Sequence, residues 1–328
     1  MNKWTLTLLA ALLLLSACSP GEKKQKRVTA SPQSAPYELL VVANKEWLGT
    51  PAGKTLLNVV EAPIEGLPQY EPCFRCTKIN PAAFNSTFQM YSNIVFAEVD
   101  SKHREVEMRI SRNVYCRPQL IVFLTAPSDQ AFIELVADRH RQIATLLNEQ
   151  EFSRERRLLA KKHSLKVKQQ AEKQFGISIL APPDIDQIKT GHNFFWASAS
   201  QQDLRLNICI YTLPLCNLTQ ELFVAARDSV MKANIPGAHE GQWMETDSRT
   251  VSSQQLPAHD GRPAHMEVRG LWDMRDDALG GPFVSYVQLD ERHDLLLVTE
   301  GFVLAPEERK RPHIRKLEAA LQTVSYAP

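Results

Sequence analysis

The sequence predicts an α+β protein with mainly antiparallel sheets and packed helices, in two halves joined by a long helical segment. A strand and a helix come first and are followed by several strand-like runs, and a second set of such runs fills the region beyond residue 176. Between the two sets, residues 129–175 carry apolar side chains at helical spacing. The composition, 44% hydrophobic and 23% charged, is that of a globular protein with a real core in each half.

The N-terminal half is predicted to occupy residues 37–127 and to begin with a buried strand. Residues 37–43 read YELLVVA, a β-rich run. Thr50 then caps a helix, and Pro51 suits its first position because no amide donor is needed there. Further strands are expected near residues 74–79, 94–99, 105–111 and 120–125.

The connector is predicted at residues 128–175, as one long or kinked helix or as two helices. Its apolar stripe thins beyond Phe152, and Gly176 closes it. Between Arg154 and Lys173 basic residues far outnumber acidic ones. Such a run usually forms a solvated helix face, and the alternative is contact with a polyanion such as lipopolysaccharide phosphates.

The C-terminal half, residues 176–328, is predicted as an antiparallel sheet with helices on one or both of its faces. Residues 204–213 alternate apolar and other side chains, as a half-buried strand does. Thr219 caps a helix, and the final helix is expected to start at Pro306 and Glu307. The other strands of this half are expected at residues 177–180, 194–199, 265–272, 282–289 and 295–303.

Residues 1–17 are predicted to be a lipoprotein signal peptide. A positively charged start and an apolar run over residues 6–15 precede two small residues, which is the pattern of a secretory signal. The run is too short for a membrane-spanning helix, which needs about 20 residues. Leu15-Ser16-Ala17-Cys18 resembles the lipobox of bacterial lipoproteins. The resemblance implies cleavage before Cys18, a diacylglycerol on the Cys18 thiol and an acylated amine, which together anchor a protein stably.

Residues 18–36 are predicted to form a lipidated, flexible tether, since they are polar, contain several prolines and lack apolar periodicity. This segment contains four basic residues, Lys23, Lys24, Lys26 and Arg27. They either contact anionic lipid headgroups or are simply part of a solvated spacer. No acidic run follows Cys18, which favours a lipid anchor in the outer membrane that faces the periplasm. The net charge of +1 shows no bias of the whole chain toward nucleic acid.

Cys73 and Cys76 form a CxxC spacing with three interpretations. Catalytic pairs of this kind sit at a helix N-terminus, where the thiol pKa is lowered, but the residues after Cys76 read as a strand. A zinc site needs two further ligands, and no second CxxC or close histidine pair is present. A structural disulfide or a pair of idle thiols is therefore favoured over metal binding and redox chemistry.

No other motif predicts catalytic, cofactor-binding or metal-binding residues. Residues 49–55 read GTPAGKT, but a phosphate-binding loop needs four residues between its glycines, and here only three intervene. Pro51 also lacks one of the backbone amides that would bind phosphate. The acidic group Asp273, Asp276 and Asp277 matches no calcium loop and favours a solvated turn. The chain also lacks HExxH and GxSxG sequences.

Several segments of the mature chain indicate a family resemblance. Besides the lipobox and residues 37–43, these are Phe175-Gly176-Ile177, RGLWDM at residues 269–274, GGPFVS at 280–285 and EGFV at 300–303. With them the chain resembles an uncharacterised lipoprotein family of Bacteroidetes, defined as a domain of unknown function. The order of helix, sheet and final helix in the second half is similar to the PsbP/Mog1 type of α+β fold. Neither resemblance implies catalytic residues.

The resulting expectation is a non-enzymatic binding or adaptor lipoprotein of the cell envelope, with an envelope protein or a glycan as partner and no cofactor. The alternative is an envelope enzyme with an unrecognised site, which would show a pocket gathering Asp, His or Cys residues with shifted pKa values. A third interpretation, a thiol-redox protein, rests on Cys73 and Cys76 alone.

Overall fold

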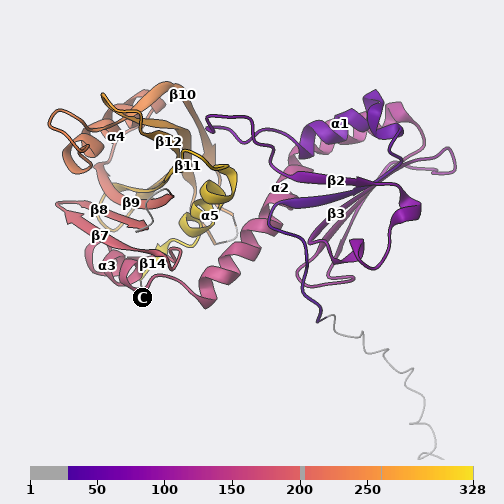
Figure 1. Cartoon of the computed structure of the whole chain (residues 1–328), viewed down its shortest axis with the longest axis horizontal. Coiled ribbons are helices and arrows are strands. Elements are labelled where there is room, and N and C mark those ends of the chain that lie inside the picture. Colours follow the sequence, from indigo (N-terminus) through magenta and orange to yellow (C-terminus); the bar gives the residue numbers. More distant parts are fainter. Residues whose placement is uncertain (1–28, 200–203, 260, 328) are drawn as a thin grey trace, which may run out of the picture.

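The computed structural model describes residues 29–199, 204–259 and 261–327. Two sheets, each with its own helices, lie at the two ends of the molecule, and a long helix joins them (Figure 1). The predicted α+β class and the joining helical segment are confirmed. The predicted signal peptide and the predicted lipidation site, Cys18, lie outside the described residues. Within the part of the chain that the structure describes, no helix is long and apolar enough to cross a membrane.

The N-terminal sheet is mixed, with the strand order β2-β1-β3-β5-β4. Its strands are β1 (Glu38–Val42), β2 (Arg75–Ile79), β3 (Asn93–Val99), β4 (Glu107–Arg112) and β5 (Leu120–Ala126). Only β4 pairs antiparallel, with β5, whereas β1 runs parallel to β2 and β3, and β3 runs parallel to β5. The expectation of mainly antiparallel pairing is therefore wrong for this sheet. The crossover that contains α1 (Pro51–Val60) returns the chain to the edge where β1 began, so that the next strand runs parallel.

Helices cover only one face of this sheet. Helix α1 starts as predicted, since the Thr50 hydroxyl accepts the Gly53 N–H at 3.3 Å. It packs beside α2 (Asp129–Lys161) over the buried core of the N-terminal half. The opposite face carries a smaller cluster under aromatic side chains and the short 3₁₀ turns at Pro81–Ala83 and Phe88–Met90.

Helix α2 belongs to both cores. Near its start, Phe132 and Ile143 are buried in the core of the N-terminal half, whereas Phe152 and Leu159 near its end are buried in that of the C-terminal half. The helix ends at Lys161, and α3 (Leu165–Phe175) follows, with the Ser164 hydroxyl accepting the Val167 N–H at 3.4 Å. Because one helix contributes to two cores, the halves are held in a defined relation to each other.

The C-terminal sheet is antiparallel throughout, as predicted, with the order β10-β11-β12-β13-β9-β8-β7. Its strands are β7 (Ile185–Gly191), β8 (Phe194–Ala199), β9 (Arg205–Pro214), β10 (Met244–Leu256), β11 (His265–Met274), β12 (Gly280–Asp290) and β13 (Leu295–Leu304). The short strands β6 (Ile177–Ser178) and β14 (Ser325–Tyr326) pair with each other. The prediction lacked β7 and β10, both at sheet edges and both largely polar.

Both faces of this sheet carry helices. Helix α4 (Gln220–Asn234), capped by Thr219 as predicted, packs on one face, and α5 (Arg311–Leu321) packs on the other with α3 and the end of α2. Helix α5 begins five residues later than expected. Its first turn is capped from the other half of the molecule, because the buried Glu71 carboxylate accepts the Lys310 N–H at 2.7 Å and the Arg311 N–H at 3.1 Å.

Candidate functional site

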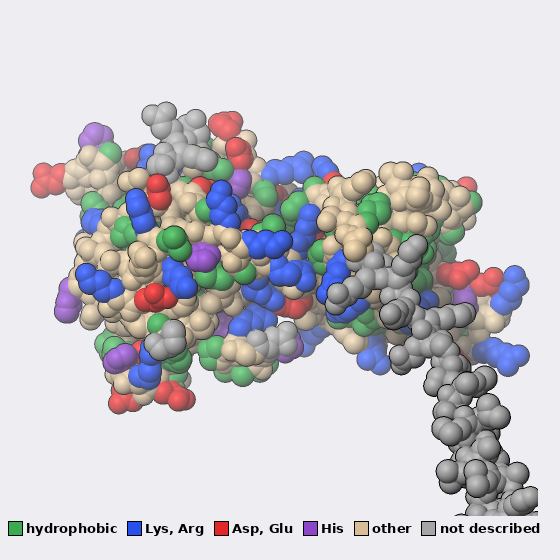
Figure 2. Space-filling view, turned by 90° about the horizontal axis from the view of Figure 1, so that it is seen from below, with side chains coloured by type: hydrophobic (Ala, Val, Ile, Leu, Met, Phe, Trp, Pro, Cys, Tyr) green, Lys and Arg blue, Asp and Glu red, His purple; other side chains and the backbone are tan. Residues whose placement is uncertain are grey.

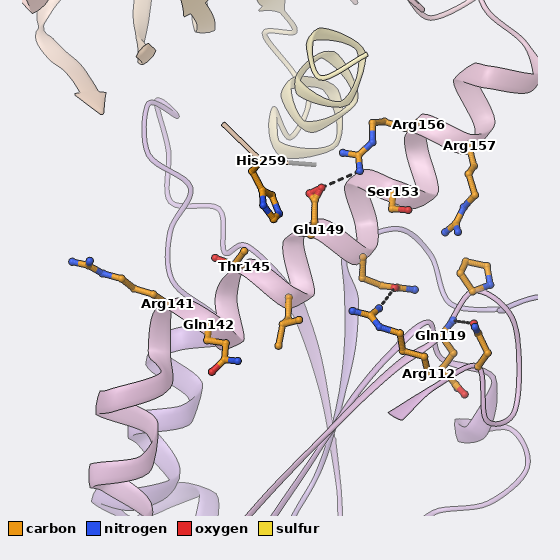
Figure 3. Close-up of a pocket in the computed structure, with 14 residues that line it drawn as sticks. Arg112, Gln119, Arg141, Gln142, Thr145, Glu149, Ser153, Arg156, Arg157 and His259 are labelled. Atoms are coloured by element: carbon orange, nitrogen blue, oxygen red, sulfur yellow. Dashed lines mark hydrogen bonds and ion pairs between the residues drawn. The ribbon is translucent and has the colours of Figure 1, made fainter. Parts of the chain in front are cut away.

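A pocket of about 600 Å³ lies against the middle of α2, between the two halves (Figure 3). Helix α2 forms its floor from Arg141 to Arg157, and the end of β4 with the loop that follows forms one wall. His259, from the loop between β10 and β11, lies on the side of the C-terminal half. Most of its lining comes from α2 and the N-terminal half, and His259 adds a contribution from the C-terminal half.

Helical spacing on α2 sets the floor of the pocket. Arg141, Thr145 and Glu149 follow each other at intervals of four residues, so they lie along one row of the helix. The adjacent row carries Gln142, Leu146, Gln150, Ser153 and Arg157. The opposite side of the helix is buried, which leaves these rows as the polar face of an amphipathic helix.

The wall formed by residues 113–119 is held rigidly by the buried side chain of Gln119. Its amide nitrogen donates to the carbonyl oxygens of Gln89 at 2.7 Å and Tyr91 at 2.9 Å, and its amide oxygen accepts the Tyr115 N–H at 2.9 Å. Asn113, in the left-handed region with φ 56°, accepts the Gln119 N–H at 3.1 Å. These bonds fix the loop beside Arg112.

Four arginines line the pocket, Arg112, Arg141, Arg156 and Arg157, against a single carboxylate, that of Glu149. The Glu149 Oε1 already accepts from the Arg156 Nη2 at 2.9 Å and from the Arg262 Nη2 at 3.5 Å. Arg262 is brought there by the backbone hydrogen bonds that it exchanges with His259. Glu149 thus has two arginine partners, both at its Oε1, and the pocket keeps an excess of positive charge.

Arg157 has no hydrogen bond or ion pair with any described residue. Burial, together with repulsion from Arg117, Arg156 and Arg154, lowers the pKa of its guanidinium. Arg112 reaches only a neutral partner, the Gln150 Oε1 at 3.3 Å. Guanidinium groups crowded without carboxylates favour an external anion, and their planar donors match phosphate or carboxylate oxygens.

The distribution of charge in the pocket suits the binding of an anion. Glu149, the only carboxylate among the lining residues, contacts two arginines through its Oε1. In residues 29–199, 204–259 and 261–327, no group of three His, Cys, Asp or Glu residues is placed to hold a metal ion. The excess of arginine is the main chemical feature of this pocket.

The structure places Cys73 and Cys76 away from this pocket, in front of and within β2, and both are free thiols. Burial and the neighbouring Glu61 carboxylate raise the pKa of the Cys76 thiol, which opposes formation of a thiolate. Cys73 lies beside α5, where its sulfur accepts from the Arg315 Nη2 at 3.7 Å.

We expect native protein to react with a maleimide first at Cys216, the exposed cysteine. Cys116 and Cys209 should react only on unfolding, because both are fully buried, and burial raises the pKa of Cys116 to about 11. The test is to follow the labelling of each cysteine-containing peptide over time by mass spectrometry. Reaction of Cys73 or Cys76 faster than a model thiol would contradict this order and support the redox interpretation.

The prediction from sequence reached only part of the site. The basic run from Arg154 contains Arg156 and Arg157, which line the pocket. Arg112 and Arg141 lie outside that run, and the sequence holds no sign that the end of β4 meets the middle of α2. His259 comes from the other half of the chain, so its place depends on how the halves pack.

Comparison with known proteins gives two family matches. Residues 33–160 match a model described as Domain of unknown function (DUF8532), and residues 164–323 match Domain of unknown function (DUF4837). The boundary falls between α2 and α3, so the first model takes in the whole connector helix. No curated protein matches the chain.

Among solved structures, a mutant of protein Mog1 is 11% identical, covering 46% of this chain and 91% of that one, with a TM-score of 0.30. The Saccharomyces cerevisiae Ran-binding protein Mog1p is 12% identical, covering 46% of this chain and 90% of that one, with a TM-score of 0.31. The two matches to domains of unknown function support an uncharacterised family, to which this chain is similar over both of its halves.

Proposed function

We propose that this protein is a lipid-anchored, non-enzymatic binding protein of the cell envelope. The pocket against the middle of α2, called the junction pocket below, binds an anionic ligand in this proposal. The lipobox at Leu15-Ser16-Ala17-Cys18 supports the anchor, and the lack of an acidic run after Cys18 supports an outer-membrane position that faces the periplasm. The observation that carries the binding role is the excess of arginine in the pocket, with Arg157 unpaired and Arg112 bonded only to an amide.

The ligand class follows from the donors. Arg112 at the end of β4 and Arg157 on α2 come from separate elements beside the pocket, so a ligand with several anionic oxygens can meet both of them. Phosphate groups supply such oxygens and accept paired hydrogen bonds from guanidinium. A phosphate-bearing envelope component is therefore the ligand class that fits this pocket.

The alternative of an envelope enzyme receives less support from the pocket. It would require Asp, His or Cys residues with shifted pKa values gathered around a cavity. The strongly raised pKa values of Cys209 and Tyr211 come from burial in the core of the C-terminal half, and neither residue lines the pocket. Glu149 and His259 do line it, but the carboxylate is held by two arginines.

We expect pyrophosphate to bind the purified protein in low-salt buffer with saturation, measured by isothermal titration calorimetry. Replacing Arg157 or Arg112 with glutamine should weaken binding roughly tenfold or more, because a hydrogen bond to a charged group contributes about 1.5–3 kcal/mol. The matched control is Arg104→Gln. Arg104 is exposed and lies before β4, whereas Arg112 ends that strand, so the control residue is far from the pocket.

Pyrophosphate binding that is absent, or equally strong in Arg157→Gln and Arg112→Gln, would contradict the proposed anion site. Loss of binding in Arg104→Gln to the same degree would show nonspecific charge attraction instead. Thermal unfolding of each variant checks that the fold is kept.

A further inference from the structure

The first residues that the structure describes lie beside two arginines near the pocket. The Ala30 carbonyl accepts the Arg117 N–H at 2.7 Å, and the Ser34 carbonyl accepts from the Arg154 Nη2 at 3.2 Å. Arg117 and Arg154 are two of the groups whose charge lowers the pKa of Arg157. The root of the N-terminal segment and the open side of the pocket therefore share one part of the surface.

The same part of the surface continues along the end of α2. Arg157, Leu158 and Lys161 follow Arg154 at three, four and seven residues and so lie on the same side of the helix as Arg154. Leu158 is 51% exposed, and Leu165, at the start of α3, is 64% exposed. Exposed lysines lie next to both leucines: Lys161, Lys162 and Lys166.

This stretch contains few acidic side chains. Glu155 is the only acid between residues 154 and 168, and burial raises the pKa of its carboxyl group. Seen from the side where the described chain begins, Lys and Arg side chains gather at the centre of the face, between the two halves (Figure 2). Exposed leucines set among basic side chains are typical of surfaces that lie on anionic membranes.

We propose that this face, formed by Arg157, Leu158, Lys161, Lys162, Leu165 and Lys166, docks on the phosphate headgroups of an anionic lipid membrane, with the junction pocket opening toward it. The inference rests on the proposed lipid anchor. From Cys18 to Thr29 the chain spans eleven residues, which reach at most roughly 40 Å. An anchor at Cys18 therefore confines the domain near the membrane, and residues 30–34, which follow the segment, contact Arg117 and Arg154 beside this face.

The test uses the chain from residue 18 with Cys18→Ser, so that no acyl chain is attached. Lys23, Lys24, Lys26 and Arg27 are replaced by glutamine in all samples, so that any binding comes from the folded part. Sedimentation with vesicles of phosphatidylcholine containing phosphatidylglycerol is compared with sedimentation with phosphatidylcholine alone. The test variant is Lys161→Glu/Lys162→Glu, and the matched control is Lys102→Glu/Arg104→Glu, with the same change in charge on the exposed loop before β4.

We expect binding to the anionic vesicles only, weakened roughly thirtyfold or more in the test variant, because each basic residue near such a surface contributes about a fivefold gain. The control variant should bind like the parent chain. No anionic-vesicle binding, or equal loss in both variants, overturns the docking proposal.

Pyrophosphate titration separates this result from the pocket. Lys161 and Lys162 do not line the pocket, so the test variant should keep its pyrophosphate affinity. A protein that binds pyrophosphate but not anionic vesicles keeps the proposed anion site and overturns the docking surface. A protein that binds neither overturns both. Circular dichroism of the test variant excludes unfolding as the cause.

Discussion

Replacing Glu300 with glutamine is expected to reduce the free energy of unfolding by about 3–5 kcal/mol, the cost of breaking a buried ion pair by removing one partner. Glu300 on β13 and Arg227 on α4 are both completely buried. The Arg227 Nη2 lies 2.7 Å from the Glu300 Oε1, and its Nε lies 3.0 Å from the Oε2. The guanidinium also lies over the Phe283 ring, 4.1 Å from its centroid.

Each partner of this ion pair depends on the other. The Glu300 carboxylate raises the pKa of Arg227 even though burial opposes the charge, so the arginine stays a cation inside the core. Ser285 donates to the Glu300 Oε2 at 2.8 Å, and the Arg227 Nη1 donates to the Thr246 hydroxyl at 2.8 Å. Glutamine at position 300 removes the buried counter-charge and leaves the cation with the more distant, partly exposed Asp228 carboxylate, 3.9 Å from the Arg227 Nη1. It also places an amide N–H group opposite the Arg227 or Ser285 donors.

Urea unfolding of Glu300→Gln measures this effect. The matched control is Asp247→Asn, which removes a carboxylate paired with Arg249, an arginine that is 87% exposed. Exposed pairs contribute about 0–1 kcal/mol, so the control should lose little. The double variant Arg227→Met/Glu300→Leu should recover much of the lost stability, because an apolar pair of similar volume avoids the unpaired charge. Equal losses in Glu300→Gln and Asp247→Asn would contradict the expected result.

The sequence contains a signal for this pair. Arg227 lies four residues from both Phe223 and Met231, so it shares the buried side of α4 with them. Glu300 interrupts an otherwise apolar run, LLLVTEGFVL. The sequence thus indicates a buried ion pair, because it places an arginine on the apolar side of a helix and a glutamate inside a buried strand. Neither residue alone shows which residue it pairs with.

Local chemistry was the most predictable part of the fold. Thr50 and Thr219 cap their helices because the side-chain oxygen satisfies an amide that the helix itself leaves free. Strands β1, β5 and β13 are buried on both faces, and their continuous apolar runs show it. The edge strand β10 was not predictable in this way, since most of its side chains face solvent and its sequence is polar.

Long-range relations were the unpredictable part. Apolar periodicity defines a strand but not its neighbour, so the parallel pairing of β1 with β3 could not be inferred. The start of α5 depends on Glu71, more than two hundred residues earlier, which caps the helix through space. The pocket also depends on long-range packing, because the end of β4, the middle of α2 and His259 are distant from one another in the sequence.

Replacing Glu318 with glutamine is the second substitution for which we expect a loss of about 3–5 kcal/mol, for the same physical reason. Glu318 on α5 is completely buried and bonds to Arg269 of β11. It also accepts from the Arg315 Nη1 at 3.2 Å. Arg269 in turn donates to Glu267 at 2.8 Å. Two arginines and two glutamates thus balance each other, and the variant leaves one positive charge in excess.

This cluster lies where the halves meet, so its loss should also loosen the junction. Arg315 contacts the sulfur of Cys73 at 3.7 Å, and its guanidinium is held by Glu318 on the same helix. Urea unfolding of Glu318→Gln gives the stability, and maleimide labelling of Cys73 in native buffer reports the opening of the contact. Labelling should become faster in this variant than in the parent protein.

Glu308→Gln is the matched control for Glu318→Gln. Glu308 lies just before α5 and pairs with His313 at 2.8 Å, but its side chain is 54% exposed, so water replaces the lost partner. We expect it to change stability by less than about 1 kcal/mol and to leave the labelling of Cys73 unchanged. If Glu318→Gln unfolds at a lower urea concentration while Cys73 labels no faster, the cluster stabilises the C-terminal half alone and does not hold the two halves together.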